Sequence, residues 1–172
     1  STIRFPLPKN FSTIKVIFGA YMGKFPVISI SLKAIEGTTF QEAKEIKDFE
    51  HILCAMGDYG LPTRILAHKT NSFLTYTSPI ETMDKVKSIG HIDPITLTEN
   101  YNFRSMDENT KLYGITGYPL AITDSPKIHN KGYRDHGMNA AYIPFRAKKV
   151  EEALEFAEEM GITGFSVTIP HK

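Results

Sequence analysis

The sequence predicts an α/β protein with a mainly parallel sheet, on the evidence of two alternating stretches. In the first half, strand and helix patterns follow one another closely at 27–35, 38–47, 51–56, 61–69 and 72–77. In the last third the alternation is clearer, at 111–116, 126–136, 140–146, 148–160 and 164–169. Strands that alternate with helices at this spacing are typical of βαβ units, for which right-handed crossovers are expected.

The last third is also where the sequence predicts a polar site. Ser125 and Pro126 are favoured residues at a helix start, so we expect Ser125 as the N-cap, with Gly137 as the C-cap. The loop before this helix places Thr123 and Ser125 beside its free N–H groups. Lys172, after the strand 164–169, brings an ammonium group to the same region. An ordinary βα unit with a capped helix has the same pattern.

The two remaining elements of this part have clear signals. Pro144 within the strand 140–146 indicates an edge or bulge position, because proline cannot donate a ladder hydrogen bond. The helix 148–160 ends at Gly161 and carries an expected apolar stripe of Val150, Ala153, Leu154 and Ala157. The glutamates opposite that stripe form a solvated face and no metal site.

In the first half, Lys33 lies in an apolar strand and Arg64 on a short helix. A lysine buried in such a strand is costly unless its pKa falls or it is paired, although a lysine at a strand end can also reach solvent. We expect Ile95, Leu97 and Tyr101 to pack back on this part of the chain. The stretch 103–109 is polar and rich in turn formers, which predicts a domain boundary near Asn109.

Composition narrows the possible partners. The chain has 172 residues, 41% of them hydrophobic and 23% charged, with a net charge of +1. This near-neutral charge favours neither nucleic acid nor a membrane surface as partner. No run approaches the length of a membrane span and the N-terminus lacks a signal pattern, so we expect a cytoplasmic protein. The single cysteine, Cys54, excludes an internal disulfide and is expected to be a buried thiol. Oligomeric state is left open.

Three strings of the last third occur in order: Tyr113-Gly-Ile-Thr-Gly-Tyr-Pro-Leu, Thr123-Asp-Ser-Pro-Lys-Ile-His-Asn and Gly164-Phe-Ser-Val-Thr-Ile-Pro-His-Lys. Together they resemble the substrate-binding domain of the shikimate dehydrogenase family. That family usually has Gly-Asn-Pro, Ser-x-Ser-Pro-x-Ile-His-Asn and Gly-x-Asn-Val-Thr-Ile-Pro-His-Lys. Thr123 keeps the hydroxyl of the usual serine, whereas Ser166 is shorter than the usual asparagine and lacks its amide.

The resemblance implies reversible, NADPH-dependent reduction of 3-dehydroshikimate to shikimate, a step of aromatic amino-acid biosynthesis. Lys172 matches the lysine that transfers a proton to the ketone oxygen. Thr123 and Ser125 are expected to bind the substrate carboxylate, and Thr168 and Ser166 the ring hydroxyls. NADP is expected on a domain outside this sequence, which contains no Gly-x-Gly-x-x-Gly string.

A second resemblance covers the first half. Lys33-Ala-Ile, Met56-Gly-Asp-Tyr-Gly-Leu-Pro-Thr-Arg-Ile, Ser72-Phe-Leu-Thr-Tyr and Gly90-His-Ile are similar to the C-terminal half of type I 3-dehydroquinate dehydratase, a βα barrel. It implies a Schiff base on Lys33 and binding of the substrate carboxylate by Arg64. The sequence departs from the family at Lys9, where a histidine is usual, and at His91, where a glutamine is usual. A barrel of this kind needs roughly 200 residues or more, so only part of one is present.

The chain therefore resembles the middle of a bifunctional dehydratase–dehydrogenase. We expect a partial βα barrel at residues 1–109 and an incomplete, three-layer αβα substrate-binding domain at residues 110–172. The 172-residue chain alone is expected to be inactive in hydride transfer. Alternatives are a non-catalytic shikimate-binding or scaffold fragment, which Lys9 and His91 favour, and a quinate/shikimate dehydrogenase relative.

Overall fold

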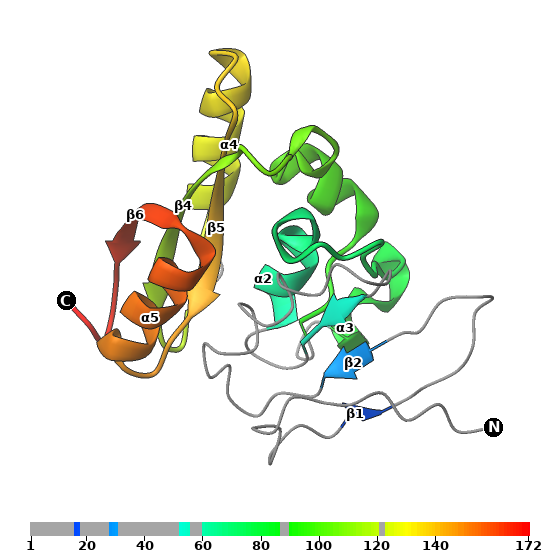
Figure 1. Ribbon diagram of the computed structural model, residues 1–172, viewed down its shortest axis with the longest axis horizontal. Coiled ribbons are helices and arrows are strands. Elements are labelled where there is room, and N and C mark those ends of the chain that lie inside the picture. The colour runs from blue at the N-terminus through cyan, green and yellow to red at the C-terminus, as the bar shows by residue number, and fades with distance from the viewer. Residues whose placement is uncertain (1–15, 18–27, 31–51, 56–59, 87–89, 121–122) are drawn as a thin grey trace.

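A computed structural model describes residues 16–17, 28–30, 52–55, 60–86, 90–120 and 123–172 of the chain (Figure 1). Its C-terminal part is a regular α/β unit, and the confirmed fold class is α/β. The elements of this unit are β4 (Lys111–Gly117), α4 (Ser125–Asp135), β5 (Ala140–Arg146), α5 (Val150–Met160) and β6 (Ile162–Val167). All three strands are parallel, and β4 lies in the middle of the order β5-β4-β6.

The edge position predicted from Pro144 is confirmed, since among the described strands β5 pairs with β4 alone. On the other side of β4, β6 carries an irregularity between its pairings with Leu112 and Tyr113. Thr163 lies at this point and donates its hydroxyl to the carbonyl of Leu112, at 3.0 Å. Beyond the irregularity, Ser166 lies beside Ile115 and Val167 beside Thr116. The register therefore brings the carboxyl ends of β4 and β6 to one edge of the sheet.

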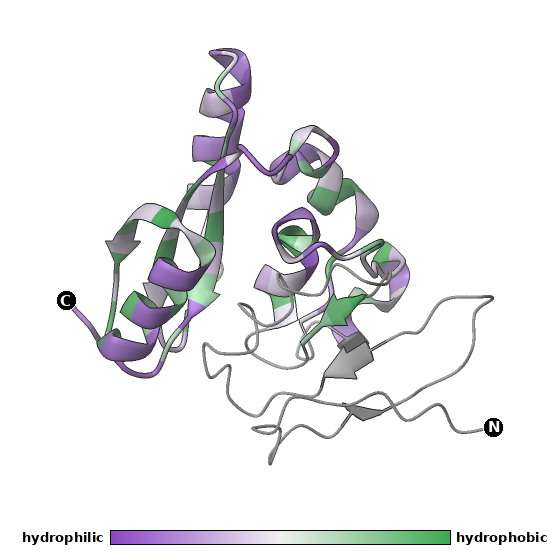
Figure 2. Cartoon of the chain, in the orientation of Figure 1, coloured by the Kyte–Doolittle hydropathy of each residue, from purple (hydrophilic) through white to green (hydrophobic). Residues whose placement is uncertain are grey.

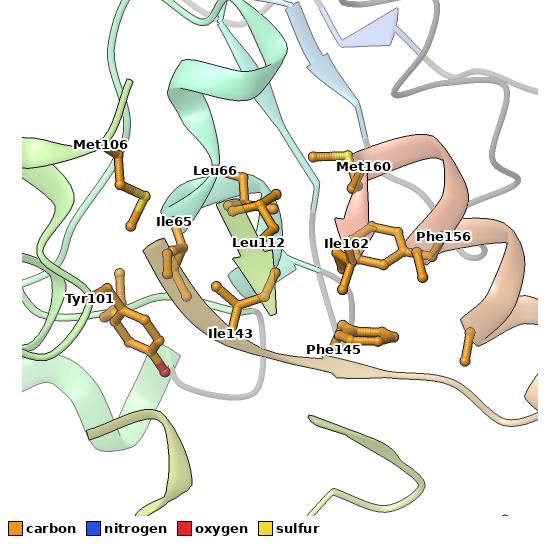
Figure 3. Close-up of a cluster of buried hydrophobic side chains, with 14 of the residues drawn as sticks. Ile65, Leu66, Tyr101, Met106, Leu112, Ile143, Phe145, Phe156, Met160 and Ile162 are labelled. Atoms are coloured by element: carbon orange, nitrogen blue, oxygen red, sulfur yellow. The ribbon is translucent and has the colours of Figure 1, made fainter. Parts of the chain in front are cut away.

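Helices cover both faces of the sheet. On one face Ile115 and Tyr142 pack with Tyr133 of α4. On the other, a larger cluster joins Leu112, Ile143 and Phe145 of the strands to residues of α5 (Figure 3). Ile65 and Leu66, at the end of α2 (Gly60–Ile65), belong to the same cluster. The core thus continues from the sheet into residues before 109, while the predicted domain boundary near Asn109 stays a prediction.

The predicted apolar stripe of α5 is wrong at two of its four positions. Ala153 and Ala157 are buried as expected, but Val150 and Leu154 are exposed. Phe156 and Met160 take their place, and Phe156 packs its ring 5.2 Å from that of Phe145. The buried stripe of α5 is therefore rotated toward the large apolar side chains of the strands, such as Ile143 and Phe145. Apart from the exposed Val150 and Leu154, the visible surface of α5 is mainly hydrophilic (Figure 2).

The first half contains shorter elements. They are β1 (Val16–Ile17), β2 (Ile28–Ile30), β3 (Leu53–Cys54), α2, η2 (Ala67–Thr70), η3 (Ile80–Thr82), α3 (Met83–Val86), η5 (Thr96–Asn100) and η6 (Phe103–Ser105). β2 pairs antiparallel with β1 and parallel with β3. The predicted helix at 38–47, with Lys9 and Lys33, lies outside the described residues, so the partial barrel stays a prediction.

Two predictions for this half are wrong. Residues 72–77 form no strand beyond a single bridge at Ser72, whose hydroxyl accepts the N–H of Leu53 at 2.9 Å. A side-chain oxygen thus takes the place of a backbone partner, and Phe73 and Leu74 after it are exposed. Ile95 is also exposed, whereas Leu97 and Tyr101 pack in the core as expected.

Candidate functional site

The candidate site lies at the carboxyl edge of the sheet, where β4 and β6 end. In parallel α/β sheets ligands bind at this edge, in the crevice formed by the loops that follow the strands. Two hydrogen bonds join these loops: Thr168 N–H donates to Thr116 O and Tyr118 N–H to Ile169 O, each at 3.0 Å. The loop after β4 leads to the start of α4, so Thr123 and Ser125 reach the same edge.

At the start of α4, the side chain of Thr123, and not that of Ser125, accepts a backbone N–H group. Its Oγ1 accepts the N–H of Ser125 at 3.2 Å and donates its own proton to Ser125 Oγ at 3.0 Å. The helix begins at Ser125, and the side chain of Asp124 makes no cap hydrogen bond. Ser125 is therefore not the N-cap, because the threonine two residues earlier satisfies its N–H. The hydroxyl of Ser125 keeps its proton for another acceptor.

The segment after β6 is anchored at its last turn. His171 N–H donates to Thr168 O at 3.0 Å, and His171 Nε2 lies 2.8 Å from the carbonyl oxygen of Ala147. Ala147 follows β5, so the loops after β5 and β6 are held together. Lys172 comes directly after this anchored turn and is exposed. The structure thus brings Thr168 and Lys172 to the edge where Thr123 and Ser125 lie.

Two residues at this edge were not singled out from the sequence. Tyr142 of β5 reaches past β4 and donates its phenol proton to Ser166 Oγ, at 3.0 Å. Tyr118 stands where the family string has asparagine, and the ammonium of Lys148 lies 5.2 Å from the centre of its ring. A cation at this distance from an aromatic face is attracted to it. Spacing in the sequence gives no sign of either contact, because each joins segments that are distant along the chain.

Arg64, the predicted carboxylate-binding residue of the first half, lies in a buried environment. Its Nη1 donates to the carbonyls of Ala55 and Gly60, at 2.8 and 2.9 Å. Burial lowers the pKa of the Arg64 guanidinium and raises the pKa of the Cys54 thiol nearby. Cys54 is a buried free thiol, as expected. Part of the hydrogen-bonding capacity of Arg64 thus goes to the backbone around α2.

We expect the His91→Gln variant to lose less stability than the wild-type chain as pH falls from 7 to 5. Burial, and then the charge of Arg64, lower the pKa of His91 below its ordinary value of 6.5. The stability that neutral His91 contributes is complete above the unfolded-state pKa and is lost as pH falls through the folded-state pKa. Urea unfolding midpoints at pH 7, 6 and 5 measure the difference, and parallel curves for the two proteins would contradict it.

Two features of the described residues concern metal binding and membrane crossing. Nowhere among residues 52–55, 60–86, 90–120 and 123–172 do three or more histidine, cysteine or acidic side chains gather in a way that could hold a metal ion. In the same part of the chain, every helix is too short or too polar to cross a membrane.

Comparison with known proteins gives a consistent result. Residues 115–172 match the family described as the shikimate dehydrogenase substrate binding domain. The chain is 35% identical over 119 residues to the chloroplastic bifunctional 3-dehydroquinate dehydratase/shikimate dehydrogenase of Arabidopsis thaliana, covering 68% of this chain and 19% of that protein. It is 43% identical over 68 residues to the NADP(+) shikimate dehydrogenase of Thermococcus kodakarensis, covering 38% and 25%.

A crystal structure of shikimate dehydrogenase from Aquifex aeolicus is similar with 32% identity and a TM-score of 0.37, over 39% of this chain and 26% of that one. The chain spans a quarter or less of the length of the two curated relatives named above. The match to the Arabidopsis protein is longer than residues 115–172, so it extends into the first half. Residues 115–172 thus match the shikimate dehydrogenase substrate-binding family, and over a longer stretch the chain is similar to a bifunctional dehydratase/dehydrogenase.

Proposed function

We propose that residues 110–172 bind shikimate and 3-dehydroshikimate as the substrate-binding part of an NADP-dependent shikimate dehydrogenase. The protein then acts in the shikimate pathway of aromatic amino-acid biosynthesis. One observation carries the proposal: the Thr123–Ser125 hydroxyl pair and the anchored segment that ends in Lys172 share one edge of the sheet. The family match over residues 115–172 supports the same conclusion.

Each polar group has a role that suits its chemistry. Ser125 donates its hydroxyl proton to the substrate carboxylate. The proton is available because Ser125 Oγ accepts, and does not donate, in its hydrogen bond with Thr123. The partial positive charge at the start of α4 favours an anion there. Thr168 and Ser166 hold ring hydroxyls, and the ammonium of Lys172 transfers a proton to the ketone oxygen as the carbonyl is reduced.

The described residues do not fit the nucleotide itself. A dinucleotide site needs glycines at a strand–helix turn so that the backbone can approach the pyrophosphate. At the last residue of β4, a Cβ on Gly117 would lie 2.5 Å from Thr168 Cγ2 and 2.7 Å from Ile169 O. The space beside this glycine is therefore filled by Thr168 and Ile169 of the segment after β6. We place NADP, as in the relatives named NADP(+) shikimate dehydrogenases, on a domain outside these 172 residues.

For residues 1–109 we propose a partial dehydratase barrel in which Lys33 forms a Schiff base with 3-dehydroquinate and Arg64 binds its carboxylate. A fork of guanidinium donors suits a carboxylate. A second candidate is a scaffold without catalysis, which the donation of Arg64 Nη1 to two backbone carbonyls favours. Borohydride trapping with 3-dehydroquinate separates them: an adduct on Lys33 supports catalysis, and its absence in the full-length protein supports the scaffold.

The dehydrogenase proposal is tested by titrating shikimate into the chain and following the binding heat. We expect saturable binding by the wild-type chain and about tenfold weaker binding by Ser125→Ala, because a donor to a carboxylate is lost. Ser105→Ala, an exposed serine of η6, is the matched control and should bind like wild type. We expect no NADPH oxidation by the chain alone. Absence of shikimate binding to the wild-type chain would overturn the proposal.

A further inference from the structure

We propose that Tyr142 is a positioning residue for substrate recognition, whose phenol fixes the Ser166 hydroxyl as a hydrogen-bond donor toward the ligand. The inference rests on the function proposed above, in which Ser166 contacts a ring hydroxyl. It concerns the one site position where the chain has a serine in place of the asparagine of the family string. The contact that carries it is the hydrogen bond from Tyr142 Oη to Ser166 Oγ, at 3.0 Å.

Tyr142 is held rigidly enough to fix a partner. Both backbone polar groups of Tyr142 pair with the side chain of Asn130, which donates to Tyr142 O at 2.9 Å and accepts from Tyr142 N–H at 2.7 Å. The ring of His129 stacks on the tyrosine ring at 4.2 Å between centroids and 12° between planes. Tyr142 is only 4% exposed. Its phenol oxygen therefore has one well-defined position.

The direction of the hydrogen bond decides what Ser166 offers to a ligand. A serine hydroxyl has one proton and two lone pairs. When one lone pair accepts the phenol proton, the hydroxyl keeps its own proton for a second partner. Ser166 is exposed, so a ligand at the sheet edge can be that partner. An acceptor on the substrate ring, either a hydroxyl or the ketone oxygen, then receives the proton.

The Tyr142–Ser166 pair compensates for the amide that the serine lacks. An asparagine amide has donors and an acceptor at fixed positions, whereas a lone serine hydroxyl rotates to suit its surroundings. Tyr142 removes this freedom from across the sheet, since β5 and β6 flank β4 on opposite sides. A fixed donor loses less orientational freedom when a ligand binds, which improves affinity for a ligand with an acceptor at that point.

The test is a calorimetric titration of the 172-residue chain with shikimate and with analogues that each lack one ring hydroxyl. For wild type, one analogue should bind about threefold to tenfold more weakly than shikimate, and that analogue identifies the hydroxyl held by Ser166. Tyr142→Phe should weaken shikimate binding by a similar factor and remove the discrimination against that analogue alone. Tyr133→Phe is the matched control, because Tyr133 is a half-buried tyrosine of α4 that packs in the same cluster as Tyr142. This variant should keep the wild-type affinity for shikimate and the discrimination against the analogue.

A double variant separates positioning from packing. Tyr142→Phe/Ser166→Ala should bind shikimate as Ser166→Ala does, because the phenol acts only through the serine. Equal weakening of all analogues by Tyr142→Phe, or additive effects in the double variant, would overturn the inference. If wild type binds shikimate and Tyr142→Phe binds it equally well, the inference fails and the proposed function stands. If wild type does not bind shikimate, the proposed function fails, and the inference fails with it.

Discussion

Replacing Asn130 with alanine is expected to lower the free energy of unfolding by about 2–4 kcal/mol, the cost of leaving two buried backbone groups unpaired. Asn130 is 1% exposed, and its amide pairs with both the N–H and the C=O of Tyr142. β5 is an edge strand, so these two groups point away from β4, and no other described strand lies beside them. The asparagine side chain takes the place of that strand.

Urea unfolding of Asn130→Ala and wild type measures this effect. The matched control is Asn139→Ala, because Asn139 is exposed and bonds to the side chains of Asp107 and Thr110. We expect the control to lose about 1 kcal/mol or less, since water can reach the exposed Asp107 and the buried Thr110 hydroxyl keeps its hydrogen bonds to Asp107. A loss at Asn130 no larger than the loss at Asn139 would show that the edge of β5 does not depend on this amide.

Asn130 also shows which features of the fold could be predicted from the sequence alone. Pro144 correctly predicted an edge strand, and the strand and helix periodicity correctly predicted the βαβαβ order, because both depend on local preferences. The sequence also contains Asn130 in a string that resembles a known family. It gives no sign that the amide of this residue closes the edge beside Tyr142, since that contact joins α4 to β5 through tertiary packing.

The wrong predictions have the same origin. The stretch 72–77 has the composition of a strand, but a strand needs a neighbour, and the structure provides only the bridge at Ser72. Ser125 has the preferences of an N-cap, yet Thr123 satisfies its N–H first. In α5, Leu154 fits an apolar stripe, although the facing strand selects Phe156 instead. In each case a specific contact overrode a correct local preference.

The site could be predicted in part. The hydroxyls of Thr123 and Ser125 and the position of Lys172 followed from capping preferences and from the family strings. The partners of Tyr118 and Ser166 did not, because each contact crosses from one βα unit to another. These are also positions where the chain departs from the family strings, so their surroundings differ from what the resemblance implies. Lys33 lies outside the described residues, and its role stays a proposal.

Replacing Gly117 with alanine is expected to impair both stability and substrate binding. A Cβ at this position would lie 2.5 Å from Thr168 Cγ2 and 2.7 Å from the backbone oxygen of Ile169. The backbone oxygen cannot turn away as a flexible side chain can, so the loop after β6 must move. We expect a loss of about 1–3 kcal/mol in the free energy of unfolding, as for other overpacked sites. Because Thr168 and Lys172 lie on that loop, shikimate affinity should fall about tenfold or more.

Gly132→Ala is the matched control, and its expected effect on stability has the opposite sign. A Cβ on Gly132, within α4, would meet no atom within 4 Å. Alanine there should raise stability by about 0.5–1 kcal/mol, because glycine is a poor helix former, and should leave shikimate binding unchanged. Urea unfolding and calorimetric titration of both variants measure the two effects. Unchanged shikimate affinity in folded Gly117→Ala would mean that the close approach at Gly117 supports the sheet but does not position Thr168 and Lys172.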